Sequence, residues 1–238
     1  MSNSMKSILF AVVLCVVCSI LLTTATSGLQ KYQQRNILLD KQKNILKSVG
    51  LVKPDQNYPL EAISKMYADY IKPLWVDPEG AILSPADRKE SDFPIYLYVN
   101  DDRIEGYVIP ISTRGLWGKI NGYLALQNDG STISGFTVYQ HSETPGLGGE
   151  IEKGWFQKNW VGKKIVDGGG EFVSVNIAKG STKDNVPLEK QINYVDGISG
   201  ATLTGKYLTS GLKEVLSQYE PVSIKFRKNM IQTEVVAE

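Results

Sequence analysis

The segment Ile95–Ile111, IYLYVNDDRIEGYVIPI, decides the fold class of this chain. Aromatic and β-branched residues lie on both sides of Asn100-Asp101-Asp102, a pattern typical of a β-hairpin. A second hairpin is predicted where Ile120–Leu126 and Ile133–Tyr139 flank the Asp-Gly turn of Gln127–Ser131. Successive hairpins build antiparallel sheets, so the sequence predicts an α+β fold and not a doubly wound parallel one.

Helices and further strands are expected on both sides of these hairpins. Apolar residues recur at helical spacing in Leu60–Ile71 and again in Leu203–Tyr219, where Pro221 is expected to end the helix. Val222–Phe226 is then predicted to be a strand that closes the sheet, and Phe172–Ala178 a further strand. The sequence thus predicts an antiparallel sheet with flanking helices.

Composition narrows the possible cofactors. The chain has 238 residues, a net charge of +1 and no basic stripe, which argues against a nucleic-acid partner. Its two cysteines, Cys15 and Cys18, lie in an apolar N-terminal run, and His141 is the only histidine. Iron–sulfur ligation in the globular part and a His-rich metal site are therefore excluded, and we expect no metal. A redox cofactor would have to be organic.

The N-terminal part of the sequence predicts a membrane anchor. After a short tail at 1–6, residues 7–27 form an uncharged run long enough to cross a bilayer as a helix, with a signal peptide as the alternative. Residues 28–50 are predicted to be a helical connector that ends at Gly50, and residues 51–238 the globular domain.

The charges near this span do not fix its orientation. Lys31, Arg35 and three further lysines follow the span, whereas only Lys6 precedes it. The positive-inside rule would place the domain in the cytoplasm, but the rule is weak for a long translocated domain. Orientation therefore stays open from the charges alone.

The segment Asp196–Thr204, DGISGATLT, lies directly before the last predicted helix. Small residues let the backbone approach a ligand, and the free N–H groups of a helix start favour an anion such as phosphate. Thr202 would stand beside that anion. The alternative is that Thr202 or Thr204 only caps the helix.

The glycine-rich segment His141–Glu150, HSETPGLGGE, suggests a dinucleotide fingerprint that the sequence does not support. Gly146 and Gly148 fit its first two positions, but Ile151 occupies the third, and the segment follows the hairpins and does not open a βαβ unit. We therefore reject that interpretation. Trp155 and Trp160, which follow, are expected to belong to the core.

Taken together, these segments resemble those of a known family. Asp196–Thr202 is similar to the flavinylation motif D-x-x-S/T-G-A-T. With Glu143–Gly149, Gly115–Gly118 and the N-terminal span, the chain resembles the C subunit of the sodium-translocating NADH:quinone oxidoreductases over nearly its whole length. The G subunit of the Rnf complex shares the flavinylation motif and is the alternative. Membrane-anchored binding modules and FMN sensors without a pump role are more distant alternatives.

The resemblance implies a specific role. FMN would be bound covalently through its phosphate to Thr202 by a separate flavin transferase that uses FAD. The domain would lie on the periplasmic, extracytoplasmic face of the bacterial inner membrane and relay single electrons within a complex of six subunits. Its partners would be the other subunits, the transferase and membrane lipid. The span has no ionisable residue, so sodium is not expected to pass through this chain.

The same resemblance suggests roles for individual residues. No catalytic acid, base or nucleophile is expected. Asp196 would serve recognition or metal binding by the transferase, with capping of its turn as the alternative. Glu143 would orient its loop, and His141 would be structural. The expected cofactor-binding residues are Thr202 with its neighbours Ser199, Gly200, Ala201 and Leu203, the ring contacts Thr144, Gly146, Leu147, Leu116 and Trp117, and Lys179 near the phosphate or the reduced ring, with a solvated lysine as its alternative.

Overall fold

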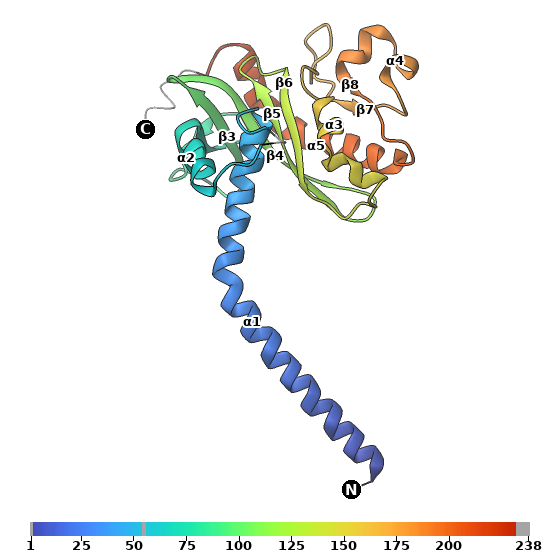
Figure 1. The fold of residues 1–238 in the computed structure, drawn as a ribbon. Helices are drawn as coiled ribbons and strands as arrows, with labels where there is room; N and C mark the ends of the chain where they lie inside the picture. Colours follow the sequence, from blue (N-terminus) through green and yellow to red (C-terminus); the bar gives the residue numbers. More distant parts are fainter. Residues whose placement is uncertain (1, 54–55, 232–238) are drawn as a thin grey trace. The chain divides into compact units, whose positions relative to one another are not determined.

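The computed structural model describes residues 2–53 and 56–231, so the outer ends of the predicted tail and domain, residue 1 and residues 232–238, lie outside it. The chain divides into two compact units, Met1–Lys41 and Gln42–Glu238. Figure 1 shows the course of the chain in each. The second unit carries the α+β domain that the hairpins predict.

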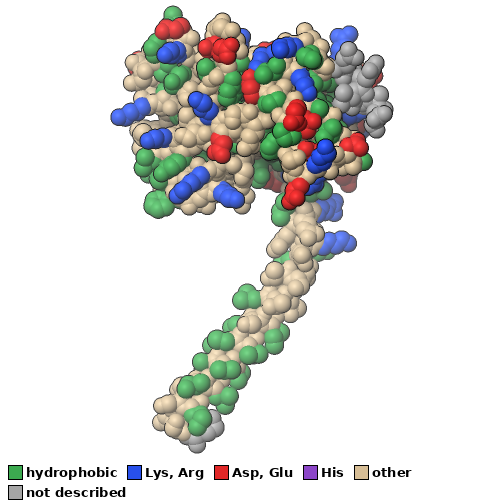
Figure 2. Space-filling view, turned by 180° about the vertical axis from the view of Figure 1, so that it is seen from behind, with side chains coloured by type: hydrophobic (Ala, Val, Ile, Leu, Met, Phe, Trp, Pro, Cys, Tyr) green, Lys and Arg blue, Asp and Glu red, His purple; other side chains and the backbone are tan. Residues whose placement is uncertain are grey.

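Helix α1, Asn3–Ser48, is continuous, so the predicted span and connector form one helix. It is long and apolar enough to cross a membrane, and Figure 2 shows apolar side chains along its N-terminal part. Its end is a Schellman motif: Gly50, at φ +80°, donates to the Lys47 carbonyl, and Leu51 N–H donates to the Leu46 carbonyl at 3.0 Å. Gly50 therefore ends the helix as the sequence predicts.

One antiparallel sheet forms the centre of the second unit (Figure 1). Its strand order is β2-β1-β3-β4-β5-β6. Both predicted hairpins are present, and the first turn is tight because Asp101 and Asp102 both adopt positive φ. The strands are β1 Ile71–Val76, β2 Ile82–Leu83, β3 Phe93–Asn100, β4 Arg103–Arg114, β5 Lys119–Gln127 and β6 Ile133–Gln140.

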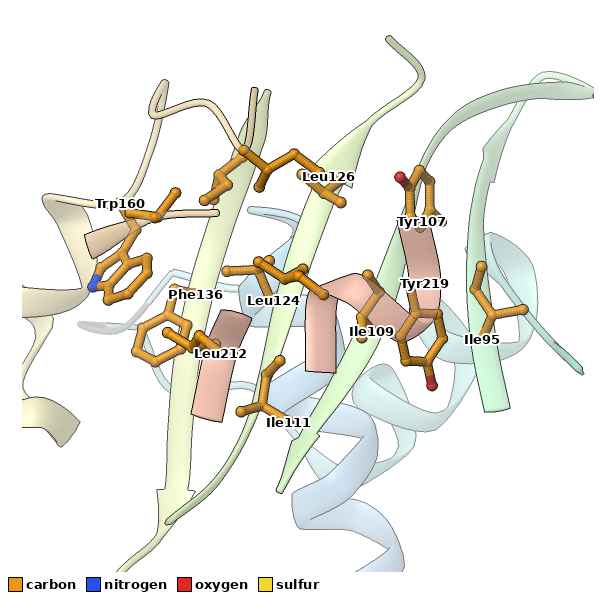
Figure 3. Packing of buried hydrophobic residues seen from close by; sticks show 14 of the residues in the cluster. Ile95, Tyr107, Ile109, Ile111, Leu124, Leu126, Phe136, Trp160, Leu212 and Tyr219 are labelled. Carbon is orange, nitrogen blue, oxygen red and sulfur yellow. The ribbon is translucent and has the colours of Figure 1, made fainter. Parts of the chain in front are cut away.

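The helix α5, Thr202–Arg227, covers one face of this sheet. Its buried residues Leu208, Leu212 and Leu216 pack on inward side chains of β4 and β5, such as Ile109 and Leu124 (Figure 3). At the β6 side, Trp160 stacks on Phe136 with ring centroids 4.2 Å apart. This apolar layer is the main core, and it fixes where α5 begins.

The opposite face is covered by helix α2, Leu60–Tyr70, and by the last turns of α1. Ile45 and Leu46 of α1 and Ile63 of α2 are buried in a cluster with Tyr96 and Tyr123 of the sheet. Alternate residues of each strand therefore serve two separate apolar layers. The second unit is a helix–sheet–helix sandwich.

The C-terminal prediction is wrong: α5 continues through Pro221, and Val222–Phe226 is helical and not a strand. Tyr219, Val222 and Phe226 continue the helical stripe, and Phe226 stacks on Tyr107 with centroids 4.3 Å apart. A proline inside a helix costs ~3 kcal/mol. Burial of Val222 and Phe226 offsets that cost.

Two further boundaries differ from the sequence prediction. Within Phe172–Ala178 only β7, Asn176–Ile177, is a strand, because Ser174 adopts φ +68° and both Val173 and Ser174 donate to the Ile165 carbonyl. The predicted helix ends at Tyr70, and Ile71–Val76 forms β1, which the sequence pattern did not predict. Pro73 made this segment look unlike a strand. The proline is tolerated because its part of β1 pairs with β3 alone and is an edge of the sheet, since β2 pairs only with Trp75 and Val76.

Short elements connect β6 to α5. They are the 3-10 helix η1 Gly148–Glu152, α3 Gly154–Lys158, α4 Thr182–Asn185, the 3-10 helix η2 Leu188–Asn193 and β8 Tyr194–Val195. Strand β8 pairs in parallel with β7.

Candidate functional site

A cavity of about 320 Å³, the Thr202 cavity, lies at the start of α5. Three segments that are far apart in sequence form it: the turn after β4, the loop after β6 and the first residues of α5. Its lining residues are Leu116, Trp117, Glu143, Thr144, Leu147, Gly148, Gly200, Ala201, Thr202, Leu203 and Thr204. The structure thus gathers eight of the cofactor-binding residues that the sequence predicts.

The start of α5 is open to a ligand. Gly200, at φ +74°, forms the turn before the helix, in which Ala201 N–H donates to the Ile198 carbonyl at 3.1 Å. No side chain caps the helix, whose flanking residue is Ala201. Neither Thr202 nor Thr204 is therefore the N-cap, and the first backbone N–H groups of α5 remain able to bind an anion.

The two threonines of this turn differ in their surroundings. Thr202 is exposed, and its hydroxyl has no hydrogen-bond partner in the described part of the chain. Thr204 is 2% exposed, and its hydroxyl donates to Glu143 Oε2 at 2.5 Å. Only the Thr202 hydroxyl is free for chemistry from the solvent side.

Asp196 holds the segment before this turn in place. Its Oδ1 accepts hydrogen bonds from the backbone N–H and the hydroxyl of Thr182, both at 2.7 Å. These bonds keep the pKa of the Asp196 carboxyl below its usual value, the backbone N–H having the larger effect. The side chain thus joins the segment before α5 to the start of α4, and among the described residues it forms no hydrogen bond within its own turn.

Gly197 brings the same segment against Lys179-Gly180. Its N–H donates to the Gly180 carbonyl at 2.8 Å, and a Cβ at Gly197 would meet the Ala178 carbonyl oxygen at 2.1 Å. No other residue fits there. Lys179 is consequently placed near the turn but lines a different cavity, of about 360 Å³, which also includes Thr202 and Lys206.

Two of the predicted cofactor-binding residues line neither cavity. Gly146, at φ +74°, is exposed and shapes the loop after β6, and Ser199 is exposed in the turn before α5.

The two tryptophans after this loop differ in burial. Trp160 is fully buried in the core, whereas Trp155 is 49% exposed and its indole N–H donates to Glu150 Oε2 at 3.0 Å. The core assignment is thus right for Trp160 and wrong for Trp155.

Glu143 is the lining residue that sequence reasoning undervalued. It is 4% exposed; Oε1 accepts the Trp117 backbone N–H at 3.0 Å, and Oε2 accepts the Thr204 hydroxyl. Its own N–H donates to His141 Nδ1 at 3.1 Å, and His141 Nε2 lies 3.2 Å from Glu152 Oε2. His141 therefore has a structural role. The sequence feature that could have identified Glu143 is its position directly before Thr144-Pro145-Gly146.

The described residues contain no group of three or more His, Cys, Asp and Glu side chains that could hold a metal ion. Backbone N–H groups, the hydroxyls of Thr144 and Thr202 and apolar walls from Leu116, Leu147 and Leu203 dominate the site instead. Such a set suits an organic ligand with an apolar body and an anionic end.

Comparison with known proteins agrees with this chemistry. The model of the FMN-binding domain family matches residues 115–217, a range that contains every residue lining the Thr202 cavity. The C subunit of the Na(+)-translocating NADH-quinone reductase of Pseudomonas aeruginosa is 34% identical over 232 residues, covering 86% of this chain and 88% of that protein. The C subunit from Yersinia pestis is 35% identical over 229 residues, covering 84% and 83%.

Solved structures are similar in fold. The crystal structure of the C subunit of the Na(+)-translocating NADH-quinone reductase from Parabacteroides distasonis has a TM-score of 0.69 and 31% identity, covering 82% of this chain and 96% of that one. Shewanella oneidensis NqrC has a TM-score of 0.67 at 24% identity, covering 83% and 99%, which supports the fold alone.

Proposed function

Because this chain belongs to the family of C subunits of the Na(+)-translocating NADH-quinone reductases, we propose that it relays single electrons through an FMN attached by a phosphoester to Thr202. The chain is a subunit of this class of oxidoreductase complex and carries an FMN-binding domain. The covalent attachment, the residues that hold the flavin and the one-electron relay are the proposed part.

The observation that carries the proposal is the contrast between Thr202 and Thr204. Attachment requires an accessible hydroxyl beside donors that can hold phosphate oxygens. Thr202 offers this at the uncapped first turn of α5, whereas the Thr204 hydroxyl is buried and already bonded to Glu143. The helix dipole and free N–H groups favour the phosphate charge at Thr202.

The remaining walls fit the flavin ring. Leu116, Leu147 and Leu203 give the Thr202 cavity apolar walls against which a flat ring can lie, and Thr144 adds a hydroxyl. Lys179 lines the neighbouring cavity with Thr202 and can approach the phosphate. When bound, FMN supplies a ring that accepts and releases electrons one at a time. Protein groups near the ring then set its reduction potential.

The anchor and the partners complete the proposal. The apolar helix α1 fits a membrane-anchored protein. We further propose that residues 7–27 cross the bacterial inner membrane and that residues 51–238 lie on its periplasmic side, with 1–6 as a tail and 28–50 as the connector. The partners would be the other members of a complex of six subunits, a flavin transferase that uses FAD and recognises the surface around Asp196, and membrane lipid.

A gel experiment tests the covalent attachment. The full chain is coexpressed with a flavin transferase and run on a denaturing gel, where a covalent flavin gives a fluorescent band. We expect the band in wild type and in Thr204→Val, which removes the other candidate hydroxyl, and none in Thr202→Ala. A band that survives Thr202→Ala, or its absence from wild type, would overturn the proposal.

A further inference from the structure

The buried carboxylate of Glu143 joins all three segments of the Thr202 cavity. It begins the loop after β6, accepts the backbone N–H of Trp117 in the turn after β4, and accepts the hydroxyl of Thr204 in α5. Trp117 and Thr204 lie 26 and 61 positions from Glu143 in the sequence. Removing this one side chain would leave the three segments without their shared contact.

Two glycines show that the surrounding backbone is fitted to this carboxylate. A Cβ at Gly115 would lie 2.4 Å from Glu143 Oε1. A Cβ at Gly148 would lie 2.8 Å from Oε2 and 2.4 Å from the Thr204 hydroxyl oxygen. The turn after β4 and the loop after β6 can approach Glu143 only because both positions lack a side chain.

Two hydrogen-bond donors, and no cation, contact the Glu143 carboxylate in the described part of the chain. Each oxygen accepts a hydrogen bond, and charge-assisted bonds of this kind are stronger than neutral ones. Among the residues that the structure describes, no lysine, arginine or histidine side chain forms an ion pair with it. No ion pair with a described residue therefore offsets the charge of this carboxylate, whose residue lines the cavity.

We propose that Glu143 is a positioning residue with a second, electrostatic effect: it holds the walls of the Thr202 cavity together, and its charge lowers the reduction potential of the flavin bound there. This inference rests on the proposed function. Electrons added to the ring bring negative charge close to a buried carboxylate, and the repulsion is screened less at a buried carboxylate than at one exposed to solvent. The other ionisable groups near this loop that the structure describes are Glu150, and Glu152 with Lys153 and His141.

Two substitutions separate the positioning effect from the charge. Glu143→Gln removes the charge and keeps the geometry, because its amide oxygen can accept the Trp117 N–H and its NH₂ can donate to Thr204. Glu143→Asp keeps the charge but is too short to bond both partners. Glu150→Gln is the matched control: it removes a charge seven positions away in a side chain that does not line the cavity.

The experiment uses the full chain in detergent. Hydrogen–deuterium exchange of peptides that contain Trp117, measured without flavin, reports the positioning. The midpoint potential of the flavin-loaded protein, measured by spectroelectrochemistry, reports the charge. We expect Glu143→Asp to speed exchange at Trp117 and to leave the potential near wild type. We expect Glu143→Gln to keep exchange slow and to shift the potential to more positive values, further than Glu150→Gln does.

Each half can fail independently. Wild-type exchange at Trp117 in Glu143→Asp would overturn the positioning role, and it remains measurable even where Glu143→Gln does not fold. A potential of Glu143→Gln equal to that of Glu150→Gln, or a shift of the Glu143→Asp potential as large as that of Glu143→Gln, would overturn the electrostatic effect. A fluorescent gel band in every variant shows that covalent attachment itself is intact, so failure here differs from failure of the proposed function.

Discussion

The main core and the Thr202 cavity share the helix α5, but different forces hold them together. Under the middle of α5, Leu208, Leu212 and Leu216 are buried against a continuous sheet, and apolar contact is the stabilising interaction. At its first turn, three loops meet around Glu143, and individual hydrogen bonds and glycines decide the geometry. A core spreads its energy over many contacts, whereas the cavity depends on a few atoms.

The largest effect is expected from truncating the core. Trp160 is fully buried and stacks on Phe136, so Trp160→Ala should lower the free energy of unfolding by ~3–5 kcal/mol. Trp155→Ala is the matched control, because this side chain is 49% exposed, and should cost about 1 kcal/mol or less. Urea denaturation of the full chain in detergent measures both. Equal losses would contradict the division between core and surface tryptophans.

A smaller loss is expected from adding one methyl group to the cavity wall. Gly148→Ala places a carbon within 2.4 Å of the Thr204 hydroxyl oxygen and should destabilise the protein by about 1–3 kcal/mol. Gly154→Ala, six residues later in α3, meets nothing within 4 Å and should stabilise by up to ~1 kcal/mol, since alanine favours helix. The same denaturation assay applies. A harmless Gly148→Ala would show that the three loops can move apart.

The same difference between core and cavity explains how much of the fold could be predicted from the sequence alone. Both hairpins and the apolar stripe of α5 were predictable because their periodicity follows from burial on one face. Pro221 and Pro73 misled the prediction, because local propensity gave no sign that Phe226 stacks on Tyr107 or that β2 pairs with only two residues of β1.

The cavity was predictable only in part. Its segments were found from short motifs, and Thr202, Leu147 and Trp117 do lie together. Nothing in the sequence says that Glu143 bonds to Thr204, 61 positions away, or that Asp196 accepts two bonds from Thr182. Such contacts depend on the tertiary structure, which brings residues distant in sequence within hydrogen-bonding distance of each other. That is why, before the fold was known, only the resemblance to the flavinylation motif distinguished Thr202 from Thr204.

The smallest effect is expected from a change of pH, because a segment held by charged hydrogen bonds responds to acid more than an apolar core does. Thr182 holds the pKa of Asp196 below the value of about 3.9 that an unfolded chain has. The stability that Asp196 contributes is therefore fully present above about pH 5 and is lost as the pH falls through the folded pKa.

Asp196→Asn should accordingly lower the free energy of unfolding by about 1–2 kcal/mol at pH 7, which is the usual range for a hydrogen bond to a charged group. The loss should be smaller near pH 3, where the wild-type carboxylate is itself becoming protonated. Thr182→Val, which removes one of the two donors and keeps the carboxylate, should show a weaker pH dependence than wild type. Urea midpoints at about pH 7, 5 and 3.5 give the comparison. If the urea midpoints of wild type and Asp196→Asn differ by the same amount at all three pH values, the Asp196 charge adds nothing to stability. The segment Asp196–Thr202 would then be held only by Gly197, which packs against Ala178 and bonds to Gly180.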